Sequence, residues 1–247
     1  MTKLNPINSS EDKSITRGFL WNANQQLAKL SAEDRILFSL QYLPDNYALS
    51  SSFGAQSAVS LHLLTQAYPD IPVVLIDTGY LFPETYQFID QLTERLKLNL
   101  KVYQSEISNG WQEARFGKRW SKSVDDLQDY NQMNKVEPME RALAELNIGT
   151  WFAGLRRRQA STRANLPFIQ LFKKRIKVHP LIDWTNQQLH HYLIKHKLPY
   201  HPLWEKGYVS IGDTHSSVPI SAGMSEVQTR FNGRIRECGL HVEELNP

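Results

Sequence analysis

The segment YALSSSFGAQS, residues 47–57, decides the fold that we expect for this chain. Its first half predicts a strand over Tyr47–Ser51, and a helix is expected from about Ala55 to Ala67. Backbone N–H groups at the start of such a helix lack intrahelical partners, and the helix dipole adds positive charge there. With serine hydroxyls and Gly54, the loop between the two elements is typical of an anion-binding site. A plain strand-to-helix turn capped by serine explains the same residues equally well, because a single glycine is weak evidence.

Strand and helix patterns alternate after this segment. PVVLID, at residues 72–77, is a nearly continuous apolar run, as expected of a strand buried on both faces of a parallel sheet. Pro83 suits the first turn of a helix over Phe82–Leu96, and Leu98–Tyr103 has the pattern of a third strand. This spacing predicts an α/β fold with an open, mostly parallel sheet and helices on both faces. Further elements are expected as helices over Ser31–Leu43, with Ser31 as N-cap, over Val136–Leu146 and from the capping-box residue Thr185 to Lys197, and as a strand over Thr150–Leu155.

Polar residues follow the second predicted strand. Asp77, Thr78 and Gly79 are expected beside the first loop, because the carboxyl ends of neighbouring parallel strands meet at one edge, where open α/β sheets bind ligands. Ordinary turn chemistry and a helix N-terminus at Pro83 also explain these residues. Their position therefore favours a binding role only slightly.

A run of arginines follows the strand predicted at Thr150–Leu155. Guanidinium groups at the carboxyl end of a strand suit phosphate or sulfate, which they can bind through paired hydrogen bonds. We expect Arg156 and Arg163 to point inward and Arg157 and Arg158 to lie on the surface.

The composition is that of an ordinary globular protein, with 41% hydrophobic and 21% charged residues. The 28 lysines and arginines exceed the 25 acidic residues by too little to indicate nucleic-acid binding. No stretch approaches the roughly 20 apolar residues of a membrane span, and polar Met1–Lys13 does not resemble a signal peptide, so we expect a cytoplasmic protein.

Cys238 is the only cysteine in the chain. An internal disulfide is therefore impossible, and an iron–sulfur or thiolate-held metal site would lack ligands. A lone cysteine is normally a buried, inert small hydrophobe. Cys238 instead lies in a polar, glycine-flanked tail, where Arg234, Arg236 and His241 can favour a reactive thiolate. If this thiol does redox chemistry, the second thiol must come from another molecule.

Taken together, these features resemble the phosphoadenylyl-sulfate (PAPS) and adenylyl-sulfate (APS) reductase family. The resemblance covers nearly everything from Ser31 to His241, including SSSFGAQSAVSLHL, DTGYLFPETY, WFAGLRRRQASTRA and ECGLH. It implies the fold of the adenine-nucleotide α-hydrolase-like proteins, whose PP-loop usually reads S-G-G-x-D-S. Here Phe53 stands beside the glycine and Gln56 takes the acidic position. The missing carboxylate favours nucleotide binding without magnesium-assisted cleavage of a pyrophosphate.

The resemblance also implies a nucleotide-binding reductase domain over residues 1–222, a C-terminal catalytic tail over residues 223–247 that carries the cysteine, and a mechanism. Cys238 would attack the sulfur of PAPS, form S-sulfocysteine and release adenosine 3′,5′-bisphosphate, and a thioredoxin or glutaredoxin dithiol would then liberate sulfite. Phosphate or sulfonate oxygens would contact the cations Lys135, Arg156, Arg163 and Arg230. The other expected substrate contacts are Ser51, Ser52, Phe53, Gly54, Gln56, Asp77, Thr78, Gly79, Gly154, Leu155 and His241.

APS reductases of this family carry an iron–sulfur cluster on four cysteines. The corresponding positions here are Tyr130, Asn131, Asp213 and Ser216. The resemblance therefore implies the cluster-free branch, with no metal, no bound cofactor, a preference for the 3′-phosphorylated substrate, and a homodimer. Two alternatives stay open: a cluster-free APS reductase, and a non-catalytic nucleotide- or RNA-binding module on the same fold. The second would leave Cys238 unexplained.

Overall fold

A computed structural model describes residues 15–231 and Leu240 of the chain. In this part of the chain a six-stranded sheet runs in the order β3-β2-β1-β4-β6-β5. Neighbouring strands are parallel except for β5 and β6, which form an antiparallel pair at one edge. The mostly parallel sheet expected from the sequence is thereby confirmed. The strands are β1 (Tyr47–Ser50), β2 (Pro72–Ile76), β3 (Asn99–Tyr103), β4 (Thr150–Ala153), β5 (Ile169–Phe172) and β6 (Arg175–Val178).

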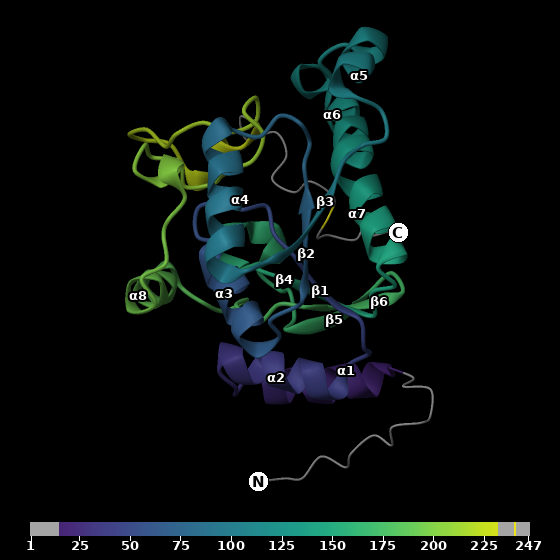
Figure 1. Ribbon diagram of the computed structural model, residues 1–247, viewed down its shortest axis with the longest axis vertical. Helices are drawn as coiled ribbons and strands as arrows, with labels where there is room; N and C mark the ends of the chain where they lie inside the picture. The colour runs from purple at the N-terminus through teal and green to yellow at the C-terminus, as the bar shows by residue number, and fades with distance from the viewer. Residues whose placement is uncertain (1–14, 232–239, 241–247) are drawn as a thin grey trace.

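Helices cover both faces of the sheet, as the spacing predicts (Figure 1). On one face α3 packs against both α4 and α8, and on the other α7 packs on β2 and β3. Two further helices, α1 and α2, lie across the lower end of the molecule in Figure 1. The helices are α1 (Arg17–Leu27), α2 (Ala32–Tyr42), α3 (Ala58–Ala67), α4 (Pro83–Leu96), α5 (Asn109–Phe116), α6 (Val124–Asn131), α7 (Glu137–Glu145) and α8 (Asn186–Lys195).

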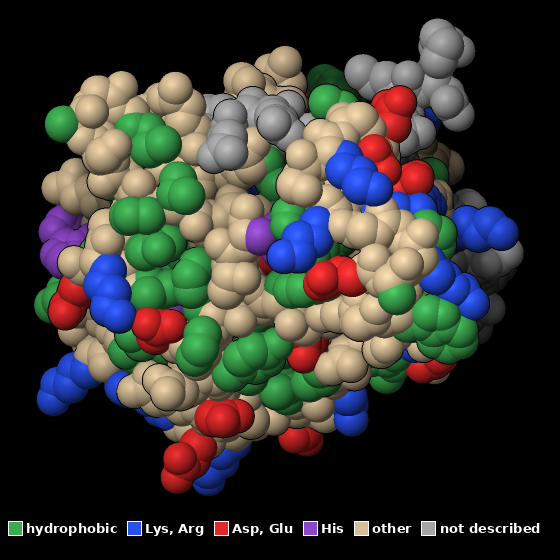
Figure 2. All heavy atoms as spheres, turned by 90° about the horizontal axis from the view of Figure 1, so that it is seen from above, with side chains coloured by type: hydrophobic (Ala, Val, Ile, Leu, Met, Phe, Trp, Pro, Cys, Tyr) green, Lys and Arg blue, Asp and Glu red, His purple; other side chains and the backbone are tan. Residues whose placement is uncertain are grey.

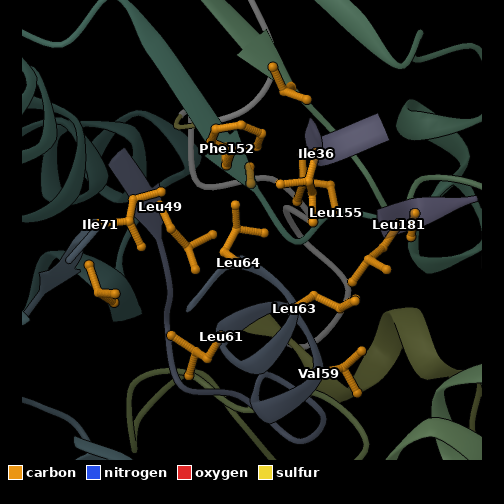
Figure 3. Packing of buried hydrophobic residues seen from close by; sticks show 14 of the residues in the cluster. Ile36, Leu49, Val59, Leu61, Leu63, Leu64, Ile71, Phe152, Leu155 and Leu181 are labelled. Atoms are coloured by element: carbon orange, nitrogen blue, oxygen red, sulfur yellow. The ribbon is translucent and has the colours of Figure 1, made fainter. Parts of the chain in front are cut away.

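Successive residues of the central strands belong alternately to two separate hydrophobic clusters. Leu49 of β1 and Phe152 of β4 belong to the larger cluster, where Leu64 of α3 lies close to both (Figure 3). Their sequence neighbours Ala48 and Trp151 point to the opposite face and pack with α7. Because successive side chains of a strand point to opposite faces, both faces of the sheet are buried, and the strands read as continuous apolar runs.

The predicted elements agree with the structure to within a few residues, and their caps explain the ends. Ser31 accepts a hydrogen bond from Asp34 N as the N-cap of α2, and Thr185 forms the predicted capping box of α8. Helix α3 begins at Ala58, later than the expected Ala55, because residues 51–57 form the turn that carries the loop. The helix predicted over Val136–Leu146 is the second half of a longer one, joined to α6 through a π-helical turn at Gln132–Val136.

From Pro199 onward the described chain forms short 3₁₀ turns and isolated bridges. Leu81 bridges Asp213, which brings this irregular segment against the loop after β2. A second bridge pairs Ser217 with Arg230, and Phe231 N donates to Ser216 O over 2.9 Å. Residues 229–231 of the predicted tail at 223–247 are thus hydrogen-bonded to the preceding segment, and the division into two domains stays a prediction.

Candidate functional site

A pocket of about 310 Å³ opens at the carboxyl edge of the parallel strands. The last residues of three neighbouring strands, Ser50, Ile76 and Ala153, lie in its wall. This volume lies near the lower end of the range of small-molecule pockets, about 300 to 1,000 Å³. The site therefore lies where open α/β sheets bind ligands, at the edge predicted from the strand pattern.

The loop after β1 has an unusual backbone. Phe53 adopts a left-handed conformation with φ of 48°, although its side chain is large and completely buried. It stands where the S-G-G-x-D-S pattern has its first glycine, the residue type that adopts a left-handed backbone most readily. Burial of the phenyl ring in the larger hydrophobic cluster offsets this strain. The Phe53 side chain therefore fixes the loop to the hydrophobic core and does not line the pocket.

The helix that follows presents polar groups to the same space. Ser57, the N-cap of α3, lines the pocket, and its buried hydroxyl has no hydrogen-bond partner within residues 15–231 and Leu240. A buried hydroxyl that lacks a partner is costly unless a ligand or water satisfies it. Together with the positive end of the α3 dipole, it makes this corner of the pocket suitable for an anion.

Gly154 directly follows the last residue of β4 and lies in close contact with α3. A Cβ atom at this position would lie 2.9 Å from Ser60 Oγ and 3.2 Å from Ser60 Cβ, closer than ordinary packing allows. The glycine thus lets the strand end and the helix lie together at the bottom of the pocket, and Leu155 continues the lining.

Arg156 lies in the pocket wall, where it is 7% exposed. Its guanidinium donates to Asn186 Oδ1 over 2.8 Å and to Gln56 Oε1 over 3.2 Å. The amide in the acidic position of the loop pattern therefore orients an arginine without neutralising its charge. Arg163 also lines the pocket and donates to Gln159 Oε1 over 2.9 Å.

The two arginines expected on the surface behave differently. Arg158 is exposed, as predicted. Arg157 is half-buried: its guanidinium carbon lies 5.0 Å from the ring centroid of Phe168, and its Nε donates to Leu166 O. The prediction for Arg157 was wrong because an aromatic ring and a backbone carbonyl bind its guanidinium and shield it partly from water.

The most buried charges of the pocket form an ion pair between distant segments. Lys135, on the π-helical turn, places its Nζ 2.7 Å from Asp213 Oδ2 in the irregular segment. The Asp213 side chain also accepts hydrogen bonds from Thr78 Oγ1 at 2.6 Å and Tyr130 Oη at 3.1 Å. Burial alone would raise the pKa of Asp213, but the Lys135 ammonium and the donated hydrogen bonds lower it below its usual value. Asp213 is consequently a charged carboxylate that fixes the Lys135 ammonium in the pocket wall.

Aromatic rings enclose this ion pair. The Lys135 Nζ lies 5.2 Å from the ring centroids of both Tyr130 and Phe231. His215 stacks on Trp120 at a centroid distance of 4.0 Å, and burial lowers the pKa of this imidazole to about 4. A neutral histidine packed among rings adds no second cation beside Lys135.

Arg230 reaches the pocket from the end of the irregular segment. Its guanidinium lies directly against the backbone of Gly212, where any Cβ atom would collide with it. The glycine thus provides the room in which the guanidinium sits.

Asp77 and Gly79 belong to the turn beneath the pocket and do not line it. The Asp77 carboxylate accepts hydrogen bonds from Gly79 N, Tyr86 Oη and Gln104 Nε2 at 2.8–3.0 Å. Two other predicted residues, Cys238 and His241, lie outside the described residues. The pocket wall brings together the remaining predicted residues, namely Ser51, Ser52, Gly54, Gln56, Thr78, Lys135, Gly154, Leu155, Arg156, Arg163 and Arg230.

Several lining residues were absent from the sequence-based prediction. Ser60 lies on α3, and its spacing after Gly54 could have indicated it. Ser57 belongs to the loop motif itself but was not chosen as a substrate contact. Asp213 gave a weaker signal, since it appeared only as a position where related proteins have a cysteine. No local signal indicates Asn186, Trp204 or residues 209–212, because only the folded chain brings them to this edge. Gln159 lies within the arginine-rich run after Leu155 but was not chosen as a contact.

Basic and acidic side chains are interspersed over the face seen from the top of Figure 1 (Figure 2). On the described part of this face they do not gather into a single basic field of the kind that binds nucleic acid. In residues 15–231 and Leu240, no three His, Cys, Asp or Glu side chains are arranged to hold a metal ion. The same described residues include no helix with the length and apolarity of a membrane span.

The sheet order, the serine-rich loop and the cationic pocket define a nucleotide-binding α/β protein. Residues 46–219 match the family model described as phosphoadenosine phosphosulfate reductase domain, so the chain belongs to this family. It is similar to two proteins named phosphoadenosine 5′-phosphosulfate reductase. The one from Shewanella oneidensis is 62% identical over 231 residues, 94% of each chain, and the one from Vibrio cholerae is 60% identical over 224 residues, 91% of this chain and 88% of that protein.

Solved structures agree with this assignment. The chain is similar to the crystal structure of phosphoadenylyl-sulfate (PAPS) reductase from Candida auris in a phosphate complex, with a TM-score of 0.72 and 29% identity over 83% of this chain and 98% of that one. The FMN adenylyltransferase of Candida glabrata, at 15% identity and a TM-score of 0.56 over 85% of this chain and 79% of that one, shares the fold. The predicted adenine-nucleotide α-hydrolase-like fold is confirmed.

Proposed function

We propose that this protein reduces PAPS to sulfite and adenosine 3′,5′-bisphosphate, with Cys238 as nucleophile. The observation that carries the proposal is the pocket itself, which gathers an anion-binding loop and four cationic side chains at one sheet edge. Relatives that are 60–62% identical bear the name of this activity. The 3′-phosphate and 5′-phosphosulfate of PAPS are the kind of anionic groups that such a pocket suits.

The position of Leu240 supports a role for the cysteine in this pocket. Leu240 follows Cys238 by two positions in the sequence and lines the pocket wall. Two residues of extended chain span only about 7 Å. A thiol so close in the sequence to the pocket wall is the natural nucleophile for a bound phosphosulfate.

The first chemical step transfers the sulfonate group. The Cys238 thiolate attacks the sulfur of PAPS, an S–S bond forms, and the bond from sulfur to the bridging phosphate oxygen breaks. The electron pair of that bond leaves with adenosine 3′,5′-bisphosphate, on whose 5′-phosphate negative charge develops. Lys135 and Arg156, held in place by Asp213 and by Asn186, stabilise this charge in the partly dry pocket.

The second step releases sulfite and restores the thiol. A dithiol of the thioredoxin or glutaredoxin type attacks the Cys238 sulfur, sulfite leaves, and a mixed disulfide forms. The second thiol of the donor resolves this disulfide, so the donor is oxidised by two electrons and Cys238 returns to its reduced form. Since the sequence holds one cysteine, both electrons come from outside the chain.

We further propose a protein without a bound cofactor, working as a homodimer in the cytoplasm, as the family resemblance implies. A catalytic thiol that must be regenerated by a dithiol suits that reducing compartment. Light scattering that gives the mass of one chain at micromolar concentration would contradict the dimer.

Replacement of the nucleophile tests the proposed activity. Cys238→Ser is expected to abolish sulfite formation from PAPS and reduced thioredoxin, because a serine hydroxyl cannot replace the thiolate in the S–S bond. Affinity for adenosine 3′,5′-bisphosphate, measured by calorimetry, should stay at the wild-type value and thereby serve as the folding control. Substantial turnover by the variant would contradict the proposed mechanism.

A further inference from the structure

Lys177 lies in the middle of β6 and is completely buried. Its strand neighbours are Trp151 on β4 and Gln170 on β5, so it belongs to the sheet and not to the pocket lining. Burying an ammonium group is costly unless its charge is compensated and its N–H groups are bonded. The position therefore needs an explanation beyond packing.

Two aromatic rings enclose the charged end of this side chain. The Lys177 Nζ lies 3.9 Å from the ring centroid of Trp151 and 4.2 Å from that of Phe172. Both distances fall within the range of cation–π attraction, which strengthens when the groups are removed from water. The rings thus form an aromatic cage that holds the ammonium in one place.

The caged ammonium donates a hydrogen bond to the carbonyl oxygen of Leu240 over 2.8 Å. This contact joins β6 to a residue 63 positions later in the sequence. The Leu240 side chain packs against the hydrophobic cluster that contains Trp151 and Phe172, and it also lines the pocket. One residue near the end of the chain is therefore held by its carbonyl and its side chain at the boundary between sheet and pocket.

We propose that Lys177 is a positioning residue, which fixes the segment bearing Cys238 by binding the Leu240 carbonyl. The inference rests on the proposed function of Cys238. A methionine of similar length would fill the aromatic cage without the cost of burying an ammonium group. The lysine supplies what methionine cannot, a directional hydrogen bond to the segment that bears the nucleophile.

The test measures sulfonate transfer in a single turnover. Reduced wild type and Lys177→Met are mixed with PAPS in the absence of any external thiol, and the sulfonated fraction is followed by intact mass. Transfer is expected to be about tenfold to a hundredfold slower in the variant, the range equivalent to one hydrogen bond from a charged donor. Affinity for adenosine 3′,5′-bisphosphate should not change, and the thermal midpoint should be unchanged or higher.

Two further variants make the result specific. Lys174→Met removes an exposed lysine from the β5–β6 turn and should transfer sulfonate at the wild-type rate. Leu240→Ala removes the apolar half of the same contact and should also slow transfer. If both groups fix one segment, the slowing in Lys177→Met/Leu240→Ala will be smaller than the product of the two single effects.

The outcomes separate this inference from the proposed function. If the wild-type protein itself gains no sulfonate, the result contradicts the proposed function, and with it the inference that rests on that function. If wild type is sulfonated and Lys177→Met reacts equally fast, Lys177 has no positioning role and the inference is overturned. It is also overturned if Lys177→Met loses nucleotide affinity and thermal stability together, because the lysine would then simply maintain the fold.

Discussion

The pocket has two walls of different construction. One, the strand wall, consists of residues 51, 52, 54–57 and 153–156. These residues connect β1 to α3, or end β4 and follow it. The other, the irregular wall, consists of residues 209–213 with Arg230, which belong to no long helix or strand. In the strand wall, neutral amides orient Arg156. In the irregular wall, a buried carboxylate on Asp213 holds a lysine from a different part of the chain.

This difference shows how each wall keeps its shape. The strand wall depends on local backbone geometry, in which hydrogen bonds of the sheet and the start of a helix set the positions of its atoms. The irregular wall has few such constraints, and a charge pair between Lys135 and Asp213 takes their place. We therefore expect changes in the irregular wall to act through charge, and changes in the strand wall to act through packing.

The largest effect is expected from Asp213→Asn. The change leaves the Lys135 ammonium buried without its counter-ion, a loss that costs about 3 kcal/mol of unfolding free energy. Sulfite formation should fall at least about tenfold, because Lys135 is no longer held against the pocket. Urea unfolding and a steady-state assay measure the two effects. Asp125→Asn, an exposed change on α6, is the control. If the two variants are equally stable, the Lys135–Asp213 ion pair does not hold the irregular wall in place, and the proposed difference between the walls is wrong.

A smaller difference in unfolding free energy is expected between alanine substitutions at two glycines, one in each wall. Gly154→Ala brings a methyl group against Ser60 on α3 and should cost about 1–2 kcal/mol of unfolding free energy through overpacking. Gly212→Ala meets only the end of the flexible Arg230 side chain, so stability should change by less than about 0.5 kcal/mol while nucleotide affinity falls. Denaturant unfolding and calorimetry on both variants provide the comparison. The reverse order of stabilities would contradict it.

The smallest effect concerns acid sensitivity of the irregular wall. Burial lowers the pKa of His215 to about 4, whereas the unfolded chain takes up this proton near pH 6.5. The unfolded state thus binds more protons between these values, so the folded state loses stability as the pH falls from about 6.5 to about 4. His215→Phe keeps the stacking on Trp120 and removes the titration, so the loss between pH 7 and pH 5 should shrink by about 1 kcal/mol. An unchanged pH dependence of unfolding would contradict this account.

The strand wall could be predicted from the sequence because its signals are local. The apolar run at residues 72–77, the serines after Tyr47 and the arginines after Leu155 each mark the end of a strand. Parallel pairing then brings these ends to one edge without further information. The left-handed backbone at Phe53 could not be predicted, because phenylalanine rarely adopts this conformation and glycine usually occupies such positions.

Apart from Arg230, which the family resemblance implied, the irregular wall could not be predicted, because its contacts join segments far apart in the chain. Thr78 and Asp213 are 135 positions apart, and no periodic pattern indicates that they meet. The hairpin of β5 and β6 was missed for a related reason. Lys177 interrupts the apolar pattern of β6, and only the aromatic rings of neighbouring strands make a buried lysine acceptable there.

Intact mass measurement after incubation with PAPS tests the central claim most directly. Reduced protein is mixed with PAPS without any thioredoxin, and a parallel sample receives APS. We predict that one sulfonate is added to Cys238 by PAPS and removed by subsequent reduced thioredoxin. An adduct formed from APS but not from PAPS would contradict the substrate assignment, and the absence of an adduct from either would contradict the proposed chemistry of Cys238.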